Sequence, residues 1–141
     1  MATKHRYYRI TIFVNRVPEM SEDEFHKHWS STHRQLAEDS LIKYGIAKYR
    51  QYHTPSALVP EAEAKCPGLD KVNKLGFDGA ADFIMADIES FYKFRQDPYY
   101  VSHIDADAAI LFDWESARWT VGWEEVYVKD GRVVDMPDGE D

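Results

Sequence analysis

Hydrophobic and polar residues alternate near the start of the chain. Tyr8, Ile10, Ile12 and Val14 fall on one side of this alternation, and Arg9, Thr11 and Asn15 fall on the other. A period of two predicts a β-strand over residues 7–15 with one buried face. Further strands are predicted at three places: the Tyr-rich segment 46–54, the apolar segment 80–86 and the amphipathic segment 119–128.

After the first strand the apolar period changes to that of a helix. Ser21 and Glu24 have the spacing of a capping box, in which each side chain accepts a hydrogen bond from an amide at a helix start. Gly45 is a typical C-terminal stop. We therefore expect one helix over residues 21–44, either straight or bent midway.

Two more helical segments are expected over residues 88–96 and 97–112, before the last strand. The resulting order of strands and helices predicts an α+β fold, with a ferredoxin-like four-stranded antiparallel sheet and helices on one face. We expect a single domain over residues 1–141, with a core of about 7–128 and an acidic C-terminal tail over 129–141.

The face of the sheet that no helix covers needs a partner. In this kind of fold the partner is usually a second copy, so that two sheets close into a dimeric α+β barrel, and we expect a homodimer. Val121 and Trp123, or the residues that alternate with them, would supply the surface. The long connection over residues 56–76 is expected to be either a functional lid or a disordered segment.

Composition narrows the function classes. The net charge of −8 argues against binding nucleic acid or an anionic membrane. Residues 1–6 lack an apolar signal region and no apolar run approaches a membrane span, so a cytoplasmic protein is expected. The single Cys66 excludes an intramolecular disulfide and a Cys-rich zinc site. The aromatic share of 14% fits either a ring-lined cavity or a plain aromatic core.

The first predicted helix carries the candidate chemistry. Its core-facing stripe includes Phe25, His28, Trp29, His33 and Leu36, whereas His26 is expected to be solvated. Polar groups on such a stripe must be hydrogen-bonded or line a cavity, so the two stripe histidines are either satisfied core residues or pocket residues. On an α-helix they lie about 140° apart, which makes a poor chelating pair, and we expect no metal.

The strands add further candidates. Tyr49, Gln51 and His53 share one face of the second strand, which suits a wet pocket or, if no helix covers it, a solvent-exposed face. Asp82 is an isolated acid in an apolar strand, so it should be paired or uncharged, with a histidine as the natural partner. Tyr99 and Tyr100 could close a pocket mouth; His103, Asp105 and Asp107 are weaker candidates. Phosphate loops, GxSxG and His-Glu-x-x-His are absent, which leaves cofactor-free acid–base chemistry.

Four motifs in order carry a resemblance that spans most of residues 7–128. They are Phe25-x-x-His28-Trp29-x-x-x-His33-x-x-Leu36, Lys48-Tyr49-x-Gln51-x-His53, the segment 77–82 and Asp97-Pro98-x-Tyr100. Together they resemble EthD-type proteins of the dimeric α+β barrel superfamily. The segment 120–127 resembles fungal members encoded with polyketide pathways, which are regarded as decarboxylases or dehydratases of anthraquinone-type precursors. The resemblance implies that His28 takes the place of a pocket tyrosine, Asp82 of a pocket histidine and Tyr100 of a catalytic histidine.

The hypothesis is therefore a cofactor-independent decarboxylase, with or without loss of water, that acts on an aromatic polyketide carboxylic acid. Such an acid contains its own electron sink, so neither a metal nor an organic cofactor is needed. We expect His33 to act as the acid and base and Asp82 to orient it, with His53 and Tyr100 on the substrate oxygens. The remaining expected substrate-binding residues are Tyr8, Phe25, His28, Trp29, Tyr49, Gln51 and His103.

Two other classes stay open. A polyketide cyclase or cofactor-free oxygenase could use the same pocket, and the product would distinguish them. A non-catalytic carrier of a phenolic metabolite would bind its ligand tightly without turnover.

Overall fold

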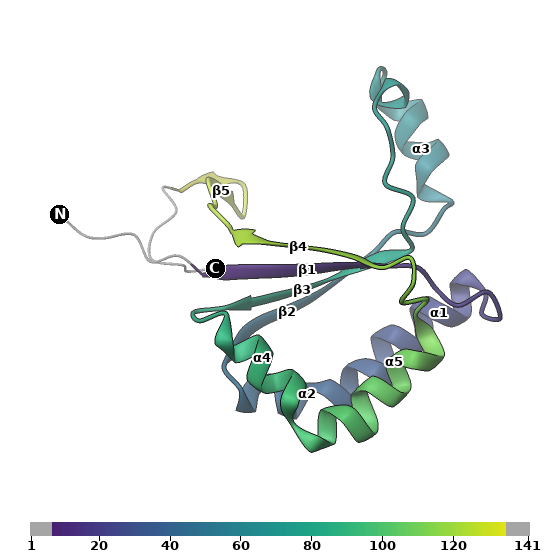
Figure 1. Ribbon diagram of the computed structural model, residues 1–141. Helices are drawn as coiled ribbons and strands as arrows, with labels where there is room; N and C mark the ends of the chain where they lie inside the picture. Colours follow the sequence, from purple (N-terminus) through teal and green to yellow (C-terminus); the bar gives the residue numbers. More distant parts are fainter. Residues whose placement is uncertain (1–6, 135–141) are drawn as a thin grey trace.

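The computed structural model describes residues 7–134; residues 1–6 and the end of the acidic tail, 135–141, lie outside the described residues. Four strands form an antiparallel sheet in the order β2-β3-β1-β4. Their bounds are Tyr8–Val14 for β1, Ile46–His53 for β2, Gly79–Met85 for β3 and Arg118–Trp123 for β4. The main helices cover one face of this sheet (Figure 1). The expected ferredoxin-like α+β fold is confirmed.

The first helical segment is α-helical except at its centre. It consists of α1 (Glu22–His28), the π-helical turn η1 (Trp29–His33) and α2 (Arg34–Lys43). Ser21 and Glu24 make both hydrogen bonds of the predicted capping box. The extent of the helix matches the prediction, and its central irregularity is a π turn.

The second helical segment lies beside the first. It consists of α4 (Glu89–Gln96), the π-helical turn η3 (Tyr100–Ile104) and α5 (Asp105–Leu111). Between α4 and η3, the Asp97 carboxylate accepts a hydrogen bond from the backbone N–H of Tyr99 at 2.7 Å and another from the Tyr44 hydroxyl. These contacts fasten the junction between α4 and η3 to the end of α2.

The core lies between the sheet and the helices as two clusters of buried apolar side chains. One contains Ile10, Ala37, Leu41, Ile46, Met85, Phe94 and Ile104, and the other contains Val14, Phe25, Trp29, Ala81, Ala108, Leu111 and Phe112. Ile12, Tyr49 and Phe83 pack against both clusters. Removal of these apolar side chains from water is the main stabilisation of the fold.

The last predicted strand, 119–128, is wrong at its C-terminal end. β4 ends at Trp123, and a separate hairpin follows, formed by β5 (Val128–Lys129) and β6 (Arg132–Val133). Asp130 and Gly131 both have positive φ, at 52° and 73°, as the central residues of a type I′ turn require. The first residues of the predicted tail are therefore a hairpin.

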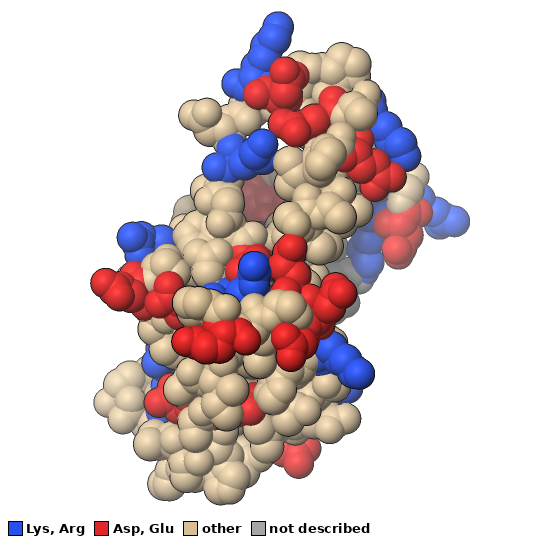
Figure 2. All heavy atoms as spheres, turned by 90° about the vertical axis from the view of Figure 1, so that its right-hand side faces the viewer, with Lys and Arg blue, Asp and Glu red and all other residues tan. Residues whose placement is uncertain are grey.

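The connection over residues 56–76 forms an arm. It contains α3 (Leu58–Lys65) and a 3₁₀ turn, η2 (Leu69–Lys71), and it projects from the sheet away from the main helices (Figure 1). A groove of about 700 Å³ lies beneath the arm, bounded by strand residues such as Phe13 and Tyr52 and by arm residues such as Val59. Figure 2 shows this hollow, with acidic and basic side chains mixed around it.

The strand register places Val121 and Trp123 on the helix side of the sheet. Val121 pairs with Ile10 and Trp123 pairs with Tyr8, but β4 is an edge strand and both side chains stay about half exposed. The open face therefore uses the alternating residues, such as Thr120. Within residues 7–134, no helix is both long and apolar enough to cross a bilayer.

Among the glycines of residues 7–134, Gly79 is packed most closely by its neighbours, and its substitution tests this packing. A Cβ at this position would lie 2.6 Å from Cζ3 of Trp29 and 2.7 Å from the carbonyl oxygen of Tyr52. We expect Gly79→Ala to lower the free energy of unfolding by about 1–3 kcal/mol, as overpacking does, when measured by urea denaturation.

Gly122→Ala is the matched control. A Cβ at Gly122 would have no heavy atom within 4 Å, so its unfolding free energy should change by less than about 0.5 kcal/mol. Equal stability of the two variants would contradict the packing described here.

Candidate active site

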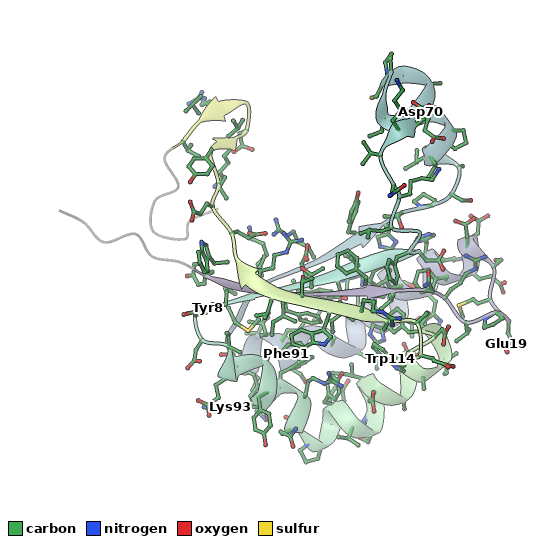
Figure 3. All side chains as sticks on the ribbon, turned by 45° about the horizontal axis from the view of Figure 1, so that its top comes forward. Tyr8, Glu19, Asp70, Phe91, Lys93 and Trp114 are labelled. Atoms are coloured by element: carbon green, nitrogen blue, oxygen red, sulfur yellow. The ribbon has the colours of Figure 1, made fainter. Side chains whose placement is uncertain are left out.

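A small cavity lies between the sheet and the helices, where the two core clusters meet. Its volume is about 50 Å³, and its lining includes the rings of Trp29, Tyr49, Phe91, Tyr100, Phe112 and Trp114. Figure 3 shows Phe91 and Trp114 on the helix side of the sheet. The cavity has room for a few water molecules, whereas small-molecule sites usually measure roughly 300–1,000 Å³. An aromatic ligand must therefore displace wall side chains as it binds.

His33 lines this cavity and is held by a carboxylate from the facing helix. Its Nδ1 lies 2.9 Å from Oδ2 of Asp107, and Nε2 of His28 lies 2.9 Å from Oδ1 of the same carboxylate. Because the Asp107 carboxylate accepts, Nδ1 of His33 carries its hydrogen. The lone pair of neutral His33 is then on Nε2, the nitrogen available to a ligand.

The π turn explains how two histidines five residues apart reach one carboxylate. On a regular α-helix they would point about 140° apart. In η1 the hydrogen bonds run from residue i to i+5, as from the Arg34 amide to the Trp29 carbonyl, so residues five apart come closer to one face. Gln51 Nε2 donates to the same Trp29 carbonyl at 2.9 Å and supports the turn.

Burial sets the protonation state of His33. Loss of hydration lowers the pKa of His33 below its usual value, although the hydrogen bond and the charge of Asp107 oppose this shift. His33 is therefore neutral at pH 7. A neutral imidazole with a free Nε2 in an apolar cavity is a general base, and Asp107 would stabilise the imidazolium that forms when it takes up a proton.

A chain of hydrogen bonds connects the groove under the arm with the cavity. His26 Nδ1 lies 2.6 Å from His53 Nδ1, His53 Nε2 lies 2.9 Å from Gln51 Oε1, and Gln51 Nε2 donates to the Tyr49 hydroxyl at 3.0 Å. Since the Gln51 oxygen can only accept, His53 Nε2 carries a hydrogen, and neutral His53 accepts at Nδ1 from His26. Nε2 of His26 is buried without a hydrogen-bond partner among the described residues.

Two phenols serve the cavity as hydrogen-bond donors. Burial raises the pKa of Tyr49, although its hydrogen bonds to Gln51 and Trp29 oppose the shift. Burial also raises the pKa of Tyr100, and the positive charge of Arg95 opposes that shift. Both phenols therefore stay protonated at neutral pH and can donate to a ligand oxygen.

The family model of the EthD domain matches residues 17–115 of this chain. The chain belongs to the EthD domain family. Among the relatives of this EthD protein, the decarboxylase claH of Passalora fulva is 31% identical over 133 residues, covering 92% of this chain and 84% of its own length. The dehydratase aurZ of Gibberella zeae is 29% identical over 126 residues, covering 89% of this chain and 82% of its own length.

Solved structures agree in fold. An EthD family protein from Bacillus halodurans superposes with a TM-score of 0.55 at 13% identity, covering 84% of the EthD protein described here and 98% of that chain. A DABB family protein with a ferredoxin-like fold from Mesorhizobium loti superposes with a TM-score of 0.56 at 14% identity, covering 84% of this chain and 96% of that chain. At such identities the likeness concerns the fold alone.

The expected partnership of Asp82 with His33 is wrong for this EthD protein. Asp82 pairs in register with Thr11 and Arg50, on the face of the sheet opposite the helices. There its carboxylate accepts hydrogen bonds from the Thr11 hydroxyl and from Arg9 Nε, the latter at 2.9 Å. Its neighbours in β3, Ala81 and Phe83, face the cavity instead.

Other predicted residues also lie outside the cavity. His53 borders the groove under the arm and does not line the cavity; it contacts the lining residue Trp29 and hydrogen-bonds Gln51. His103 is exposed, with its ring stacked on Tyr99 at 4.5 Å. Phe25 is fully buried in the core, and Tyr8 lies at the opposite end of the sheet from Trp114 (Figure 3). His33, Trp29, Tyr49 and Tyr100 are the predicted residues that the cavity brings together.

Sequence reasoning undervalued two residues. Asp107 is a weaker candidate in the sequence because its side chain could face solvent, yet it is only 8% exposed and holds His33 as expected of Asp82. Arg95 was not a candidate, yet it lines the cavity. The spacing of Asp107 with the buried Ala108 and Leu111 on α5 was the available signal, since it places the acid beside the core-facing side of that helix.

The lowered pKa of His33 predicts a pH dependence of stability. The unfolded chain, with a histidine pKa of about 6.5, binds more protons near pH 6 than the folded chain. Stability should therefore fall as the pH drops through about 6.5 and stop falling below the lowered folded pKa. In His33→Asn, whose amide can still donate to Asp107, urea denaturation between pH 7 and 5 should show a smaller fall. An equal fall in both proteins would mean that His33 is not buried neutral.

Proposed function

We propose that this EthD protein is a cofactor-independent lyase that removes CO₂ from an aromatic polyketide carboxylic acid in secondary metabolism. The observation that carries this proposal is the buried His33, which Asp107 holds with Nε2 available to the cavity. Relatives that are named decarboxylases and dehydratases, at 26–31% identity over most of the chain, support the reaction class.

In the proposed reaction His33 moves one proton. The substrate binds as a carboxylate, and Nε2 takes up one proton from solvent to form an imidazolium that Asp107 stabilises. The carbon–carbon bond to the carboxylate then breaks, CO₂ leaves, and the electron pair of that bond passes into the ring system, which becomes an enolate or phenolate. The imidazolium finally gives its proton to carbon, so that His33 ends neutral as it began and one solvent proton is consumed.

The two phenols would stabilise the charge that develops on substrate oxygens. Tyr49 and Tyr100 line the cavity as protonated donors, and a hydrogen bond from a phenol to an enolate oxygen strengthens as negative charge accumulates there.

His33 and the two phenols could equally carry out a dehydration. His33 would take a carbon-bound proton and return it to the departing hydroxyl. Trp29 and Phe112 supply ring faces against which a planar substrate would pack.

Substitution of His33 and of its partner tests the proposal. His33→Asn keeps a donor to Asp107 but removes the base, so turnover of aromatic polyketide acids should fall below detection. Asp107→Asn presents an amide donor to Nδ1, which puts the ring hydrogen on Nε2, and kcat should fall about 10²–10⁴-fold. The assay is loss of CO₂ or water, followed by mass spectrometry.

His103→Asn is the control, because it removes an exposed histidine outside the cavity and should leave kcat unchanged. Full turnover by His33→Asn would reject the assignment. Ligand binding without turnover in the unsubstituted protein would instead identify a carrier, and ring closure or O₂ uptake would identify a cyclase or an oxygenase.

We also propose that the chain works as a homodimer through the open face of its sheet. This face holds a self-neutralising network, in which Asp82 binds Arg9 while Glu124 binds both Arg9 and Arg50. Such paired charges can be covered by a second sheet at a lower desolvation cost than unpaired ones. A structural relative from Bacteroides fragilis with a ferredoxin-like fold, TM-score 0.55, is described as dimeric.

A charge placed on the open face tests the dimer. Tyr52 is 62% exposed on this face, so Tyr52→Asp should raise the monomer fraction in sedimentation equilibrium at least tenfold, because an unpaired charge would be buried. Tyr92→Asp is the matched control. Tyr92 is 63% exposed, but it lies on helix α4, away from the open face, so its substitution should not affect association. A monomer in the unsubstituted protein, or equal effects of both variants, would refute the proposal.

A further inference from the structure

The charged side chains that line the cavity carry one sign. The protein carries a net charge of −8 and 25 acidic residues, yet among the described residues no Asp or Glu side chain lines the cavity, and Asp107 lies behind His33. Of the described residues in the lining, Arg95 is the one Lys or Arg, and His33, which also lines the cavity, is neutral. A cavity with this lining favours a ligand with a negative charge.

Arg95 also has no carboxylate partner. Among the described residues, no Asp or Glu oxygen lies within 4.0 Å of its guanidinium, although most other arginines of the fold are paired. Its guanidinium carbon lies 5.7 Å from the ring centre of Phe91 and 5.6 Å from that of Tyr100. Stacking on these rings holds the planar group, and Arg95 also hydrogen-bonds the Tyr100 hydroxyl. Because none of its N–H groups is paired with a carboxylate of the described residues, the remaining N–H groups can bind the carboxylate of a ligand.

Arg95 stands at the wall between the cavity and the outside. An outer groove of about 460 Å³ is lined by α4 and η3 residues, and Phe91, Arg95 and Tyr100 line both this groove and the cavity. Asp105 lines the outer groove but makes no ion pair with Arg95. Displacement of this three-residue wall would join the two spaces, which gives the volume that an aromatic ligand needs and that the cavity alone lacks.

We propose that Arg95 is the carboxylate-binding residue of the active site and that the substrate enters through the wall of Phe91, Arg95 and Tyr100. The inference rests on the proposed function for the identity of the ligand, an aromatic carboxylate with its ring system inside the cavity. The substrate carboxylate pairs with Arg95 at the outer end, and the ring system lies toward His33 and Tyr49. Loss of CO₂ removes the charge that Arg95 holds, so the neutral product is bound less tightly than the substrate and can leave.

A matched pair of ligands tests the carboxylate subsite without turnover. The probes are 3-hydroxy-2-naphthoic acid and 2-naphthol, which differ by the carboxylate alone, and binding is followed by their fluorescence. The unsubstituted protein should prefer the acid. Arg95→Met should weaken binding of the acid roughly tenfold and binding of 2-naphthol less than about twofold, because only the acid loses a charge-assisted pair. Arg95→Lys should recover part of the loss.

Lys93→Met is the control on the same helix, since Figure 3 shows Lys93 pointing away from the sheet. It removes the same charge and should leave both affinities unchanged. Equal weakening of both probes by Arg95→Met, or no preference for the acid in the unsubstituted protein, would overturn the inference. His33→Asn should keep the preference for the acid. A lost preference in Arg95→Met without turnover by any variant would therefore support the subsite while rejecting the lyase.

Discussion

The candidate active site depends on one carboxylate that is shared by two imidazoles. Asp107 comes from α5, whereas His28 and His33 come from the first helical segment, so their hydrogen bonds join the two helical segments that cover one face of the sheet. The geometry requires the π turn η1, because a regular α-helix would turn one histidine away. The same contact that joins the helices therefore fixes the tautomer of His33, and packing and chemistry cannot be altered separately here.

Much of the fold follows from periodicity alone. The alternation in β1 correctly assigns its buried face, and the capping box and Gly45 bound the first helix closely. Helical spacing also identifies Trp29 and His33 as inward-facing, and strand alternation groups Tyr49 with Gln51 and His53 on one face, which the sequence leaves as either a pocket wall or a solvent-exposed face. These residues were predictable because each local pattern and the final packing require the same orientation.

Asp82 and Asp107 show the limit of prediction from sequence periodicity. In β3 almost every residue is apolar, so the sequence carries no alternation, and the face of Asp82 is set by the register with β1 and by Arg9 and Arg50. Asp107 lies on a helix rich in acids, where only the packing of α5 against η1 separates it from its exposed neighbours. In both cases the orientation of the acid is set by side chains from distant segments of the chain. A local pattern of hydrophobic and polar residues does not contain that information.

The direction of the chain from His26 to Tyr49 has a chemical consequence. Every donor in it points the same way, from His26 to His53, then to the Gln51 oxygen, and from the Gln51 amide to the Tyr49 oxygen. Aligned hydrogen bonds polarise one another, so the chain is a small dipole whose positive end is the Tyr49 hydroxyl hydrogen. The Tyr49 hydroxyl therefore acts as a hydrogen-bond donor toward the cavity. A ligand atom with lone pairs is favoured next to it, whereas an N–H or O–H hydrogen of a ligand is repelled.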